Sequence, residues 1–248
     1  MFEGLLNPIF DPLLNLPILW VIVIMAFLIT LIITVIYKYT TNQSLMKELK
    51  GEMKELQKEI RELKHDPKKA MEVQKKAMQT NMKYMSHSMR SMLFTFIPII
   101  LIFGWMNAHL AYHPILPGQE FTTSISFYEG IKGDVSLVIP NGISIDGNLT
   151  KSISDGEIMW GVKGDEGEYL LEYKTDTKSY THEVLITREQ KYAKPVKIVK
   201  DKTVKQISID NSKIRAMNLF GWKLGWLGTY IIISIIFSMI LRKLFKVY

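Results

Sequence analysis

The hydrophobic residues of this chain are concentrated in three long runs, near residues 17–37, 92–112 and 224–241. Each run is long enough to cross the hydrocarbon core of a bilayer, roughly 30 Å thick, as a helix. The first run carries no charge from Ile18 to Tyr37, and Lys38 follows it directly. A cleaved signal peptide has a basic start and a shorter apolar region, whereas this chain carries Glu3 and Asp11 before the run. We therefore predict three transmembrane helices, of which the first is an uncleaved anchor.

A different hydrophobic pattern fills the region between the first two runs. Its apolar residues recur at steps of three and four, which is the a/d stripe of a coiled-coil helix. The residues of this stripe are Leu45, Leu49, Met53, Leu56, Ile60 and Leu63. Pro67 then disfavours helix at Asp66, while Asp66 can cap a new helix with Pro67 at its first position. Segments of roughly 24 residues, about 36 Å of helix each, flank this break and predict an antiparallel coiled-coil hairpin.

The second helix of this hairpin, residues 67–90, carries two apolar stripes. One stripe consists of Met71, Met78, Met82, Met85 and Met89, and Met92, at the start of the second span, is grouped with them. The other stripe consists of Ala70, Val73, Ala77 and Tyr84. The first helix has one stripe to offer, so one face of the second helix is left for another partner. Methionine adapts its shape to variable apolar partners, so we predict that these methionines bind substrate. The alternatives are that they form the hairpin seam or contact lipid headgroups.

The region between the second and third runs alternates apolar and polar residues with the period of a β-strand. The expected strands lie near residues 121–127, 135–139, 143–145, 158–162, 169–173, 180–187, 196–199 and 204–209. Gly, Pro, Asn and Asp separate them at short intervals, which favours a sandwich-like domain. The segment Asp165–Tyr169 resembles the turn that precedes a tyrosine corner in immunoglobulin-like folds.

The charge distribution predicts the orientation in the membrane. Residues 38–90 hold 13 Lys or Arg against 7 Asp or Glu, and Arg242, Lys243 and Lys246 follow the last run. Both segments should be cytoplasmic. Residues 113–218 are nearly neutral, with 14 basic against 15 acidic residues. We therefore expect a multi-pass protein of the cell membrane with its N-terminus outside and its C-terminus in the cytoplasm.

These expectations define the fold class as an α-helical membrane protein with two insertions. Residues 1–40 form the external N-terminus and first transmembrane helix, 41–91 the cytoplasmic helical hairpin, and 92–112 the second transmembrane helix. Residues 113–218 form the extracytoplasmic β-domain, and 219–248 the third transmembrane helix with a basic cytoplasmic tail.

Composition and motifs argue against an enzyme. The chain has no cysteine, which excludes a disulfide framework, a thiolate metal site and a cysteine nucleophile. It contains no glycine-rich phosphate loop, His-Glu-x-x-His motif or nucleophile elbow. His109 and His113 are four residues apart, but a third metal ligand is not evident, so we interpret them as interfacial polar residues. No cofactor and no metal are predicted.

Polar residues inside the predicted spans are few: Thr30, Thr34, Thr95, Asn107, Ser234 and Ser238. They are either packing contacts between helices or the lining of a shallow, partly hydrated groove. Such a groove would lower the free-energy cost of moving a polar chain segment across the bilayer, where one charge at mid-membrane costs ~3 kcal/mol on insertion scales. Gly221 and Gly225 are expected to allow close helix approach at the outer end of the third span.

The charges of the first hairpin helix are sorted onto two flanks. The basic flank comprises Lys47, Lys50, Lys54, Lys58 and Arg61, and the acidic flank comprises Glu48, Glu52, Glu55, Glu59 and Glu62. Both flanks are either solvated or paired with the second helix. Alternatively, the basic flank meets ribosomal RNA or anionic lipid.

The order of these parts resembles the YidC/Oxa membrane protein insertases. The resemblance covers roughly residues 1–112 and 219–248 and rests on the topology and on the region from Pro98 to Trp105. It is greatest with the archaeal YidC-like group, which has three spans. The resemblance implies an ATP-independent insertase or chaperone that takes nascent membrane proteins, with the ribosome contacting the basic hairpin.

A second function from another class is kept beside the first. In it, the chain is a membrane scaffold or receptor whose external β-domain binds a protein partner and whose hairpin docks an internal one. The polar span residues discriminate between the two, because an insertase needs them to converge on a groove.

Overall fold

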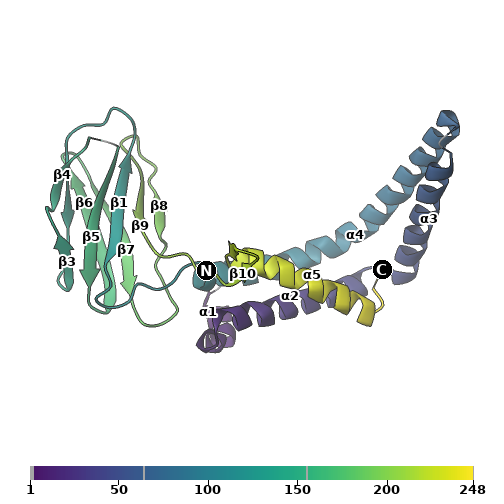
Figure 1. Ribbon diagram of the computed structural model, residues 1–248, viewed down its shortest axis with the longest axis horizontal. Helices are drawn as coiled ribbons and strands as arrows, with labels where there is room; N and C mark the ends of the chain where they lie inside the picture. The colour runs from purple at the N-terminus through teal and green to yellow at the C-terminus, as the bar shows by residue number, and fades with distance from the viewer. Residues whose placement is uncertain (1–2, 64, 155, 248) are drawn as a thin grey trace. The chain divides into compact units, whose positions relative to one another are not determined.

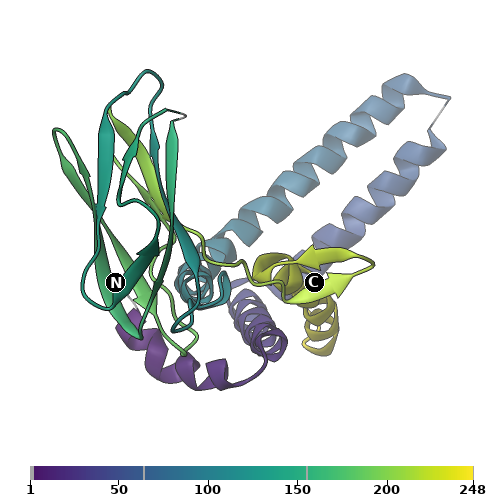
Figure 2. The same cartoon turned by 60° about the vertical axis from the view of Figure 1, so that its left-hand side comes forward.

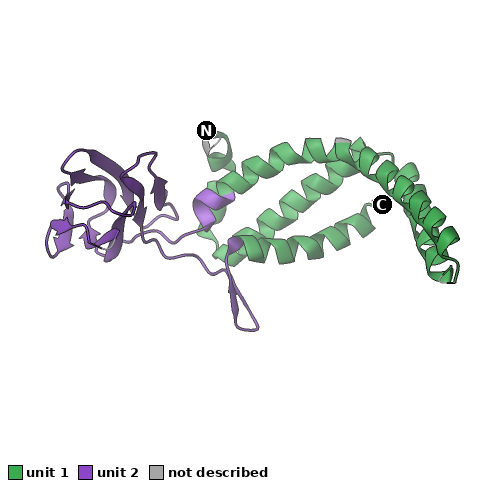
Figure 3. Ribbon diagram, turned by 90° about the horizontal axis from the view of Figure 1, so that it is seen from above, with its two compact units in different colours: residues 1–105, 227–248 green, residues 106–226 purple. Residues whose placement is uncertain are grey.

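The computed structural model describes residues 3–63, 65–154 and 156–247, and the chain divides into two compact units. The helical unit comprises residues 1–105 and 227–248, and the second unit comprises residues 106–226 (Figure 3). Each unit is described separately. The helices are α1 (Glu3–Phe10), the 3-10 helix η1 (Asp11–Asn15), α2 (Ile18–Thr40), α3 (Gln43–Glu62), α4 (Pro67–Leu110) and α5 (Trp226–Leu244), and Figure 1 labels the α-helices.

Three helical segments in the described part of the chain are long and apolar enough to cross a membrane. They are Ile18–Thr40, Ser91–Leu110 and Trp226–Leu244, which confirms the three predicted spans. The second span is continuous with the second helix of the hairpin, because α4 runs without interruption for 44 residues and contains Pro98 in its interior. It ends at Leu110 rather than at the expected residue 112.

Aromatic side chains pack the helices of the helical unit together. The rings of Phe27 in α2 and Phe237 in α5 are 5.4 Å apart. Phe103 in α4 and Tyr230 in α5 meet edge to face, with ring centroids 4.9 Å apart. Phe10 at the end of α1 lies 5.2 Å from Trp105 in α4. Edge-to-face pairs of this kind contribute about 0.5–1.5 kcal/mol each beyond the area that they bury.

The break between α3 and α4 has the predicted chemistry. Asp66 accepts a hydrogen bond from the backbone N–H of Lys69 (3.2 Å), which is the geometry of a helix cap, and Pro67 is the first residue of α4. Asn42 caps α3 in the same way, because its side chain accepts from the N–H of Leu45. Helices α3 and α4 lie side by side as a hairpin (Figures 1 and 2).

The second unit contains a β-sheet domain built from two antiparallel sheets. One sheet has the strand order β3-β5-β1-β9-β8 and the other β4-β2-β6-β7. Their strands are β1 (Phe121–Phe127), β2 (Asp134–Val138), β3 (Ile143–Asp146), β4 (Thr150–Ser152), β5 (Glu157–Gly164), β6 (Gly167–Thr175), β7 (Ser179–Ile186), β8 (Val196–Ile198) and β9 (Val204–Ile209). Buried residues of both sheets form one hydrophobic cluster that includes Ile125, Trp160, Leu171 and Val184.

The tyrosine corner expected near residue 169 is present. The Tyr169 hydroxyl donates a hydrogen bond to the carbonyl oxygen of Asp165 (3.1 Å), four residues upstream. The ring lies against Gly167, where a Cβ atom would stand 3.2 Å from the ring carbon that bears the hydroxyl. A buried hydroxyl pair joins Tyr173 of β6 to Thr123 of β1 and so links the two sheets. Burial raises the pKa of Tyr173 above its ordinary value.

An ion pair at the rim of the domain joins the turn between β6 and β7 to the loop between β8 and β9 of the other sheet. The Lys178 ammonium lies 2.7 Å from Asp201, whose other carboxylate oxygen accepts from the N–H of Thr203 (2.6 Å). The Tyr180 hydroxyl also donates to Asp201 (3.0 Å). The hydrogen bond from Lys178, followed by the one from the Thr203 backbone, holds the pKa of Asp201 well below its usual range.

The segment before the third span differs from expectation. Strands β10 (Met217–Leu219) and β11 (Trp222–Leu224) form a separate two-stranded hairpin. Gly221 lies in its turn with φ +92°, so the prediction that it allows close helix approach is wrong. The three-residue strand β4 was not predicted either, whereas β8, of the same length, was.

Candidate functional site

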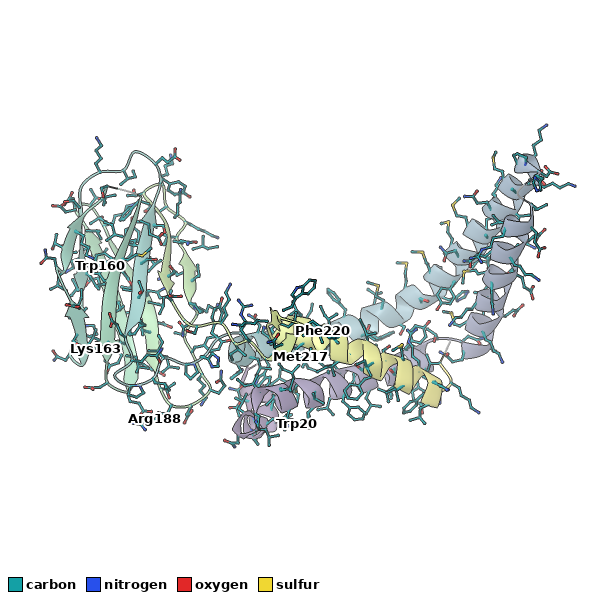
Figure 4. All side chains as sticks on the ribbon, viewed as in Figure 1. Trp20, Trp160, Lys163, Arg188, Met217 and Phe220 are labelled. Atoms are coloured by element: carbon teal, nitrogen blue, oxygen red, sulfur yellow. The ribbon has the colours of Figure 1, made fainter. Side chains whose placement is uncertain are left out.

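The methionine stripe is exposed along α4. Its six residues (Met71, Met78, Met82, Met85, Met89 and Met92) have between 56% and 69% of their surface accessible. Figure 4 shows sulfur atoms along α4 on the side turned away from α3. The stripe from Met71 to Met92 is about 32 Å long at the helical rise of 1.5 Å per residue. Large contiguous apolar surfaces that stay exposed usually mark sites of interaction with a protein, a membrane or a ligand.

The opposite stripe of α4 forms the hairpin seam. Ala70, Val73, Ala77 and Tyr84 are half-buried, and Thr80, which falls in the same register, is only 4% exposed. On α3, Met46, Leu49 and Leu56 are buried, while Met53, Ile60 and Leu63 are half-buried. The seam therefore has the heptad spacing of a coiled coil on both helices. Burial, followed by a hydrogen bond with Tyr37, raises the pKa of Tyr84 above its ordinary value.

The methionine stripe runs directly into the exposed face of the second span. Leu93, Phe96, Ile97 and Ile100 follow Met92 on α4, and each exposes more than half of its surface. The helix is not broken between the stripe and these residues. The exposed apolar surface of the hairpin helix is therefore continuous with that of the second span.

The predicted polar residues of the spans in the helical unit bond mainly to their own helices. The hydroxyl of Thr30 donates to Ala26 O (2.6 Å) and that of Thr34 to Thr30 O (2.7 Å). Thr95 likewise donates to Met92 O (2.9 Å). These three threonines are buried. Each hydroxyl oxygen keeps lone pairs that can accept a further hydrogen bond, while each of the three residues exposes no more than 8% of its surface.

The remaining polar span residues are less buried. Ser234, whose hydroxyl donates to Ile231 O (2.9 Å), and Ser238 are half-buried on α5. Asn107 is exposed near the end of α4 and belongs to the second unit, where its backbone carbonyl accepts a hydrogen bond from the Tyr192 hydroxyl. Burial raises the pKa of that hydroxyl to about 12.

Two further buried hydroxyls in the helical unit were not predicted. Ser91 is 1% exposed at the junction of hairpin and span, and Thr229 is fully buried on α5. Ser91 and Thr95 continue the seam register of α4, because they follow Tyr84 at steps of seven and four. Extending the heptad beyond the hairpin would have identified Ser91. Thr229 had no comparable signal.

The basic flank of α3 is exposed over its whole length. Lys47, Lys50, Lys54, Lys58 and Arg61 all lie at the surface. Lys58 pairs with Glu62 of the same helix at 3.7 Å, and Glu52 on the acidic flank pairs with Lys76 of α4 at 3.9 Å. Exposed pairs of this length contribute little stability, about 0–1 kcal/mol. Charges on this flank thus remain accessible to an anionic partner.

Comparison with known protein families identifies the family of this chain. Residues 3–139 match the model of a family described as integral membrane protein EMC3/TMCO1-like, and this match covers more than half of the chain. The chain belongs to the EMC3/TMCO1-like family. The family is a member of the YidC/Oxa superfamily, so the relationship inferred from the order of spans and hairpin is confirmed. No match to a curated protein or to a solved structure was found.

The match places the candidate surface within the EMC3/TMCO1-like region. It includes the first two spans, the hairpin and the methionine stripe, and it ends one residue after β2. The family consists of integral membrane proteins that are not known enzymes. Among residues 3–63, 65–154 and 156–247, no group of three or more His, Cys, Asp or Glu side chains could hold a metal ion.

Proposed function

We propose that this EMC3/TMCO1-like protein is an ATP-independent membrane protein insertase and chaperone. It receives hydrophobic nascent segments at the methionine stripe of its cytoplasmic hairpin and passes them along a partly polar intramembrane groove. The observation that carries the proposal is the exposed stripe, which α3 leaves uncovered and which continues into the exposed face of the second span. Membership of an insertase-related superfamily supports it.

The stripe supplies binding energy of a useful size. Full burial of a methionine side chain is worth about 1.5–3 kcal/mol, and more than half of each stripe residue is exposed. A bound apolar segment that covers one methionine therefore gains about 1–2 kcal/mol. Three or four such contacts hold a segment reversibly, which is what a transfer step requires, and the thioethers adapt to different sequences.

The groove lowers the cost of moving polar chain across the bilayer. Thr30, Thr34, Thr95, Ser234 and Ser238 of the helical unit are the residues proposed to line it. Their hydroxyl groups replace part of the water that a polar segment loses in lipid. Because one side of such a groove is open to lipid, an apolar segment leaves it sideways without ATP.

The orientation belongs to this proposal. The basic hairpin and the tail after α5 face the cytoplasm, where the exposed lysine flank of α3 contacts the ribosome or anionic lipid. The β-sheet domain, with its two sheets packed as a sandwich, then lies outside the cell membrane. This arrangement presents the methionine stripe on the side where nascent chains emerge.

Reconstitution tests the proposal. Proteoliposomes that contain this chain and no other protein receive a single-span substrate with a short translocated tail, released in the absence of ATP. We expect a protease-protected substrate fragment at levels above those of protein-free liposomes. Equal protection in both kinds of liposome would contradict the insertase function.

A second candidate function, a scaffold or receptor, is favoured by the β-sheet domain. Most of this domain lies beyond residue 139, where the family match ends, and it has a hydrophobic core of its own. Tyr112 and Lys213 pair as an isolated antiparallel bridge, so a short glycine-serine linker can replace residues 113–212. An insertase should keep its insertion activity in this variant, whereas a receptor should lose its function.

A further inference from the structure

The β10–β11 hairpin directly before the third span has one apolar face and one polar face. Its pairing places Leu219 opposite Trp222 and Met217 opposite Leu224, while Asn218 lies opposite Lys223. Successive residues of a strand point to opposite faces, so the first two pairs share one face and the third pair lies on the other. Figure 3 shows this hairpin as a separate projection of the second unit.

The tip of the hairpin is aromatic and open to its surroundings. Phe220 is 99% exposed and Trp222 is 75% exposed, and Figure 4 labels Phe220 at the turn. Both turn residues have positive φ, +49° at Phe220 and +92° at Gly221, as a two-residue hairpin with right-handed strand twist requires. A bulky residue is rare and strained in this region. Strain of this kind persists mainly where it serves a function.

The β10–β11 hairpin is not expected to be stable when water surrounds it on all sides. A single two-stranded hairpin is marginally stable at best in water, and it needs a further apolar surface. The two strands form a two-stranded sheet with each other only, within the described residues. An apolar environment on the Leu219–Trp222 face would supply the missing surface.

The chain connection places this hairpin close to the bilayer. One residue, Gly225, separates the end of β11 from Trp226, the first residue of α5. Phe220 precedes Trp226 by six residues, so an extended chain limits their separation to about 20 Å. Aromatic side chains prefer the headgroup level of a membrane, where their apolar rings and polar edges are both accommodated.

Basic residues complement this location. Lys213 and Arg215 are exposed in the segment before the hairpin and Lys223 is exposed on its polar face, and the Arg215 guanidinium donates to the carbonyl oxygen of Lys223 (3.3 Å). Cations at this level meet lipid phosphates while the aromatic tip lies deeper.

We propose that the β10–β11 hairpin inserts Phe220 and Trp222 into the headgroup and upper acyl region of the leaflet in which α5 begins. The partner is the lipid bilayer itself. The insertion fixes the depth of the start of α5 and stabilises a hairpin that is marginal in water. This inference needs only that α5 spans the membrane, and it does not rest on insertase activity.

A depth measurement with single cysteines tests the proposal, since the chain has none. Cysteine is introduced as Phe220→Cys and, in a matched hairpin turn of the β-sheet domain, as Thr177→Cys. Lys223→Cys reports the polar face of the same hairpin. Each full-length variant is labelled with an environment-sensitive fluorophore and reconstituted into phosphatidylcholine vesicles, with or without lipids that carry a nitroxide high on the acyl chain.

We expect the label at position 220 to emit at shorter wavelength and to lose most of its fluorescence to the nitroxide lipids. The label at 223 should be quenched less, and the label at 177 should emit as in water without quenching. Emission and quenching at 220 equal to those at 177 would overturn the proposal. A blue shift at 220 without nitroxide quenching would also overturn it, because the tip would then contact protein.

Discussion

Replacing three central stripe methionines by glutamine should separate substrate capture from folding. The triple variant Met78→Gln, Met82→Gln and Met85→Gln keeps side-chain length and nearly the same helix propensity. It removes the thioethers from a surface that is more than half exposed. Because these side chains are outside the seam, the free energy of unfolding of the hairpin should change by no more than about 0.5 kcal/mol.

The loss of substrate binding should be much larger. Each methionine contributes about 1–2 kcal/mol when a substrate covers its exposed part. Three replacements therefore remove about 3–6 kcal/mol if one segment covers all three sites, which is a loss of capture on the order of a hundredfold or more. A segment that slides to Met71, Met89 or Met92 would reduce this loss, so the lower end is the expected value.

The matched control is a residue of the seam. Leu56→Ala removes a side chain that is 5% exposed between the two helices. Truncation of a buried leucine typically costs about 2–5 kcal/mol, so this variant should loosen the hairpin. Hydrogen exchange of the hairpin amides measures the stability of both variants, and crosslinking yield to a hydrophobic nascent segment measures capture. Unchanged capture by the triple variant, with normal hairpin protection, would refute the role of the stripe.

Four further predictions concern orientation, the groove and the β-sheet domain. Protease added outside intact cells should cut within residues 113–218 and spare the hairpin, and cleavage confined to the hairpin would reverse the orientation. A cysteine in place of Thr34 should react with a membrane-impermeant maleimide, and Thr34→Leu should impair insertion of substrates with charged tails. An unreactive cysteine, together with full insertion by the leucine variant, would exclude the groove. Tyr169→Phe should lower the unfolding free energy of the β-sheet domain by about 1 kcal/mol, because it removes the hydrogen bond to the Asp165 carbonyl; an unchanged denaturation midpoint would show that this bond contributes nothing. The hydrogen bond from Lys178 depresses the pKa of Asp201. The stability that the carboxylate adds is therefore present above its unfolded pKa of about 3.9 and is lost as the pH falls below that value. Thermal melts should show this loss of stability in acid, and Asp201→Asn should remove the pH dependence.

Helix breaks, long strands and the tyrosine corner could be predicted from the sequence, because each depends on one local physical requirement. A proline preceded by a capping residue ends one helix and starts the next, so the break at Asp66 and Pro67 was readable. Strands of five residues or more alternate toward a shared core, and β1 and β9 were predicted with the bounds that the structure has. The Asp165–Tyr169 turn was recognisable because the corner needs a tyrosine at a fixed offset from the carbonyl that it binds.

The choice between the two stripes of α4 could not be made from hydrophobicity alone, since both are apolar. Side-chain size gives the physical reason for the outcome. The seam stripe contains Ala70, Ala77 and Thr80, and short side chains let two helices approach closely. Methionines at these positions would hold the helices further apart. The heptad continues through Ser91 and Thr95 with no helix breaker, which also explains why hairpin and span form one helix.

The β10–β11 hairpin could not be predicted from the hydrophobic pattern. The β10–β11 hairpin has three residues in each strand, and its Phe220-Gly221 turn lacks the asparagine or aspartate that usually marks such a turn. The polar span residues present a different difficulty. The hydroxyls of Thr30, Thr34, Thr95 and Ser234 bond to carbonyls of their own helices. Such bonds form whether a hydroxyl faces a neighbouring helix or water, so sequence spacing does not distinguish the two.

Photo-crosslinking from the two stripes of α4 tests the central claim most directly. A photoreactive amino acid is placed at Met82 on the exposed stripe or at Val73 on the seam, and ribosome-bound nascent chains with a hydrophobic segment are added to the membrane-embedded protein. We predict nascent-chain adducts from position 82 that disappear when the segment is made polar, and adducts to α3 from position 73. Adducts to α3 from position 82, without nascent-chain adducts, would show that the methionine stripe is the hairpin seam and would contradict the proposed function.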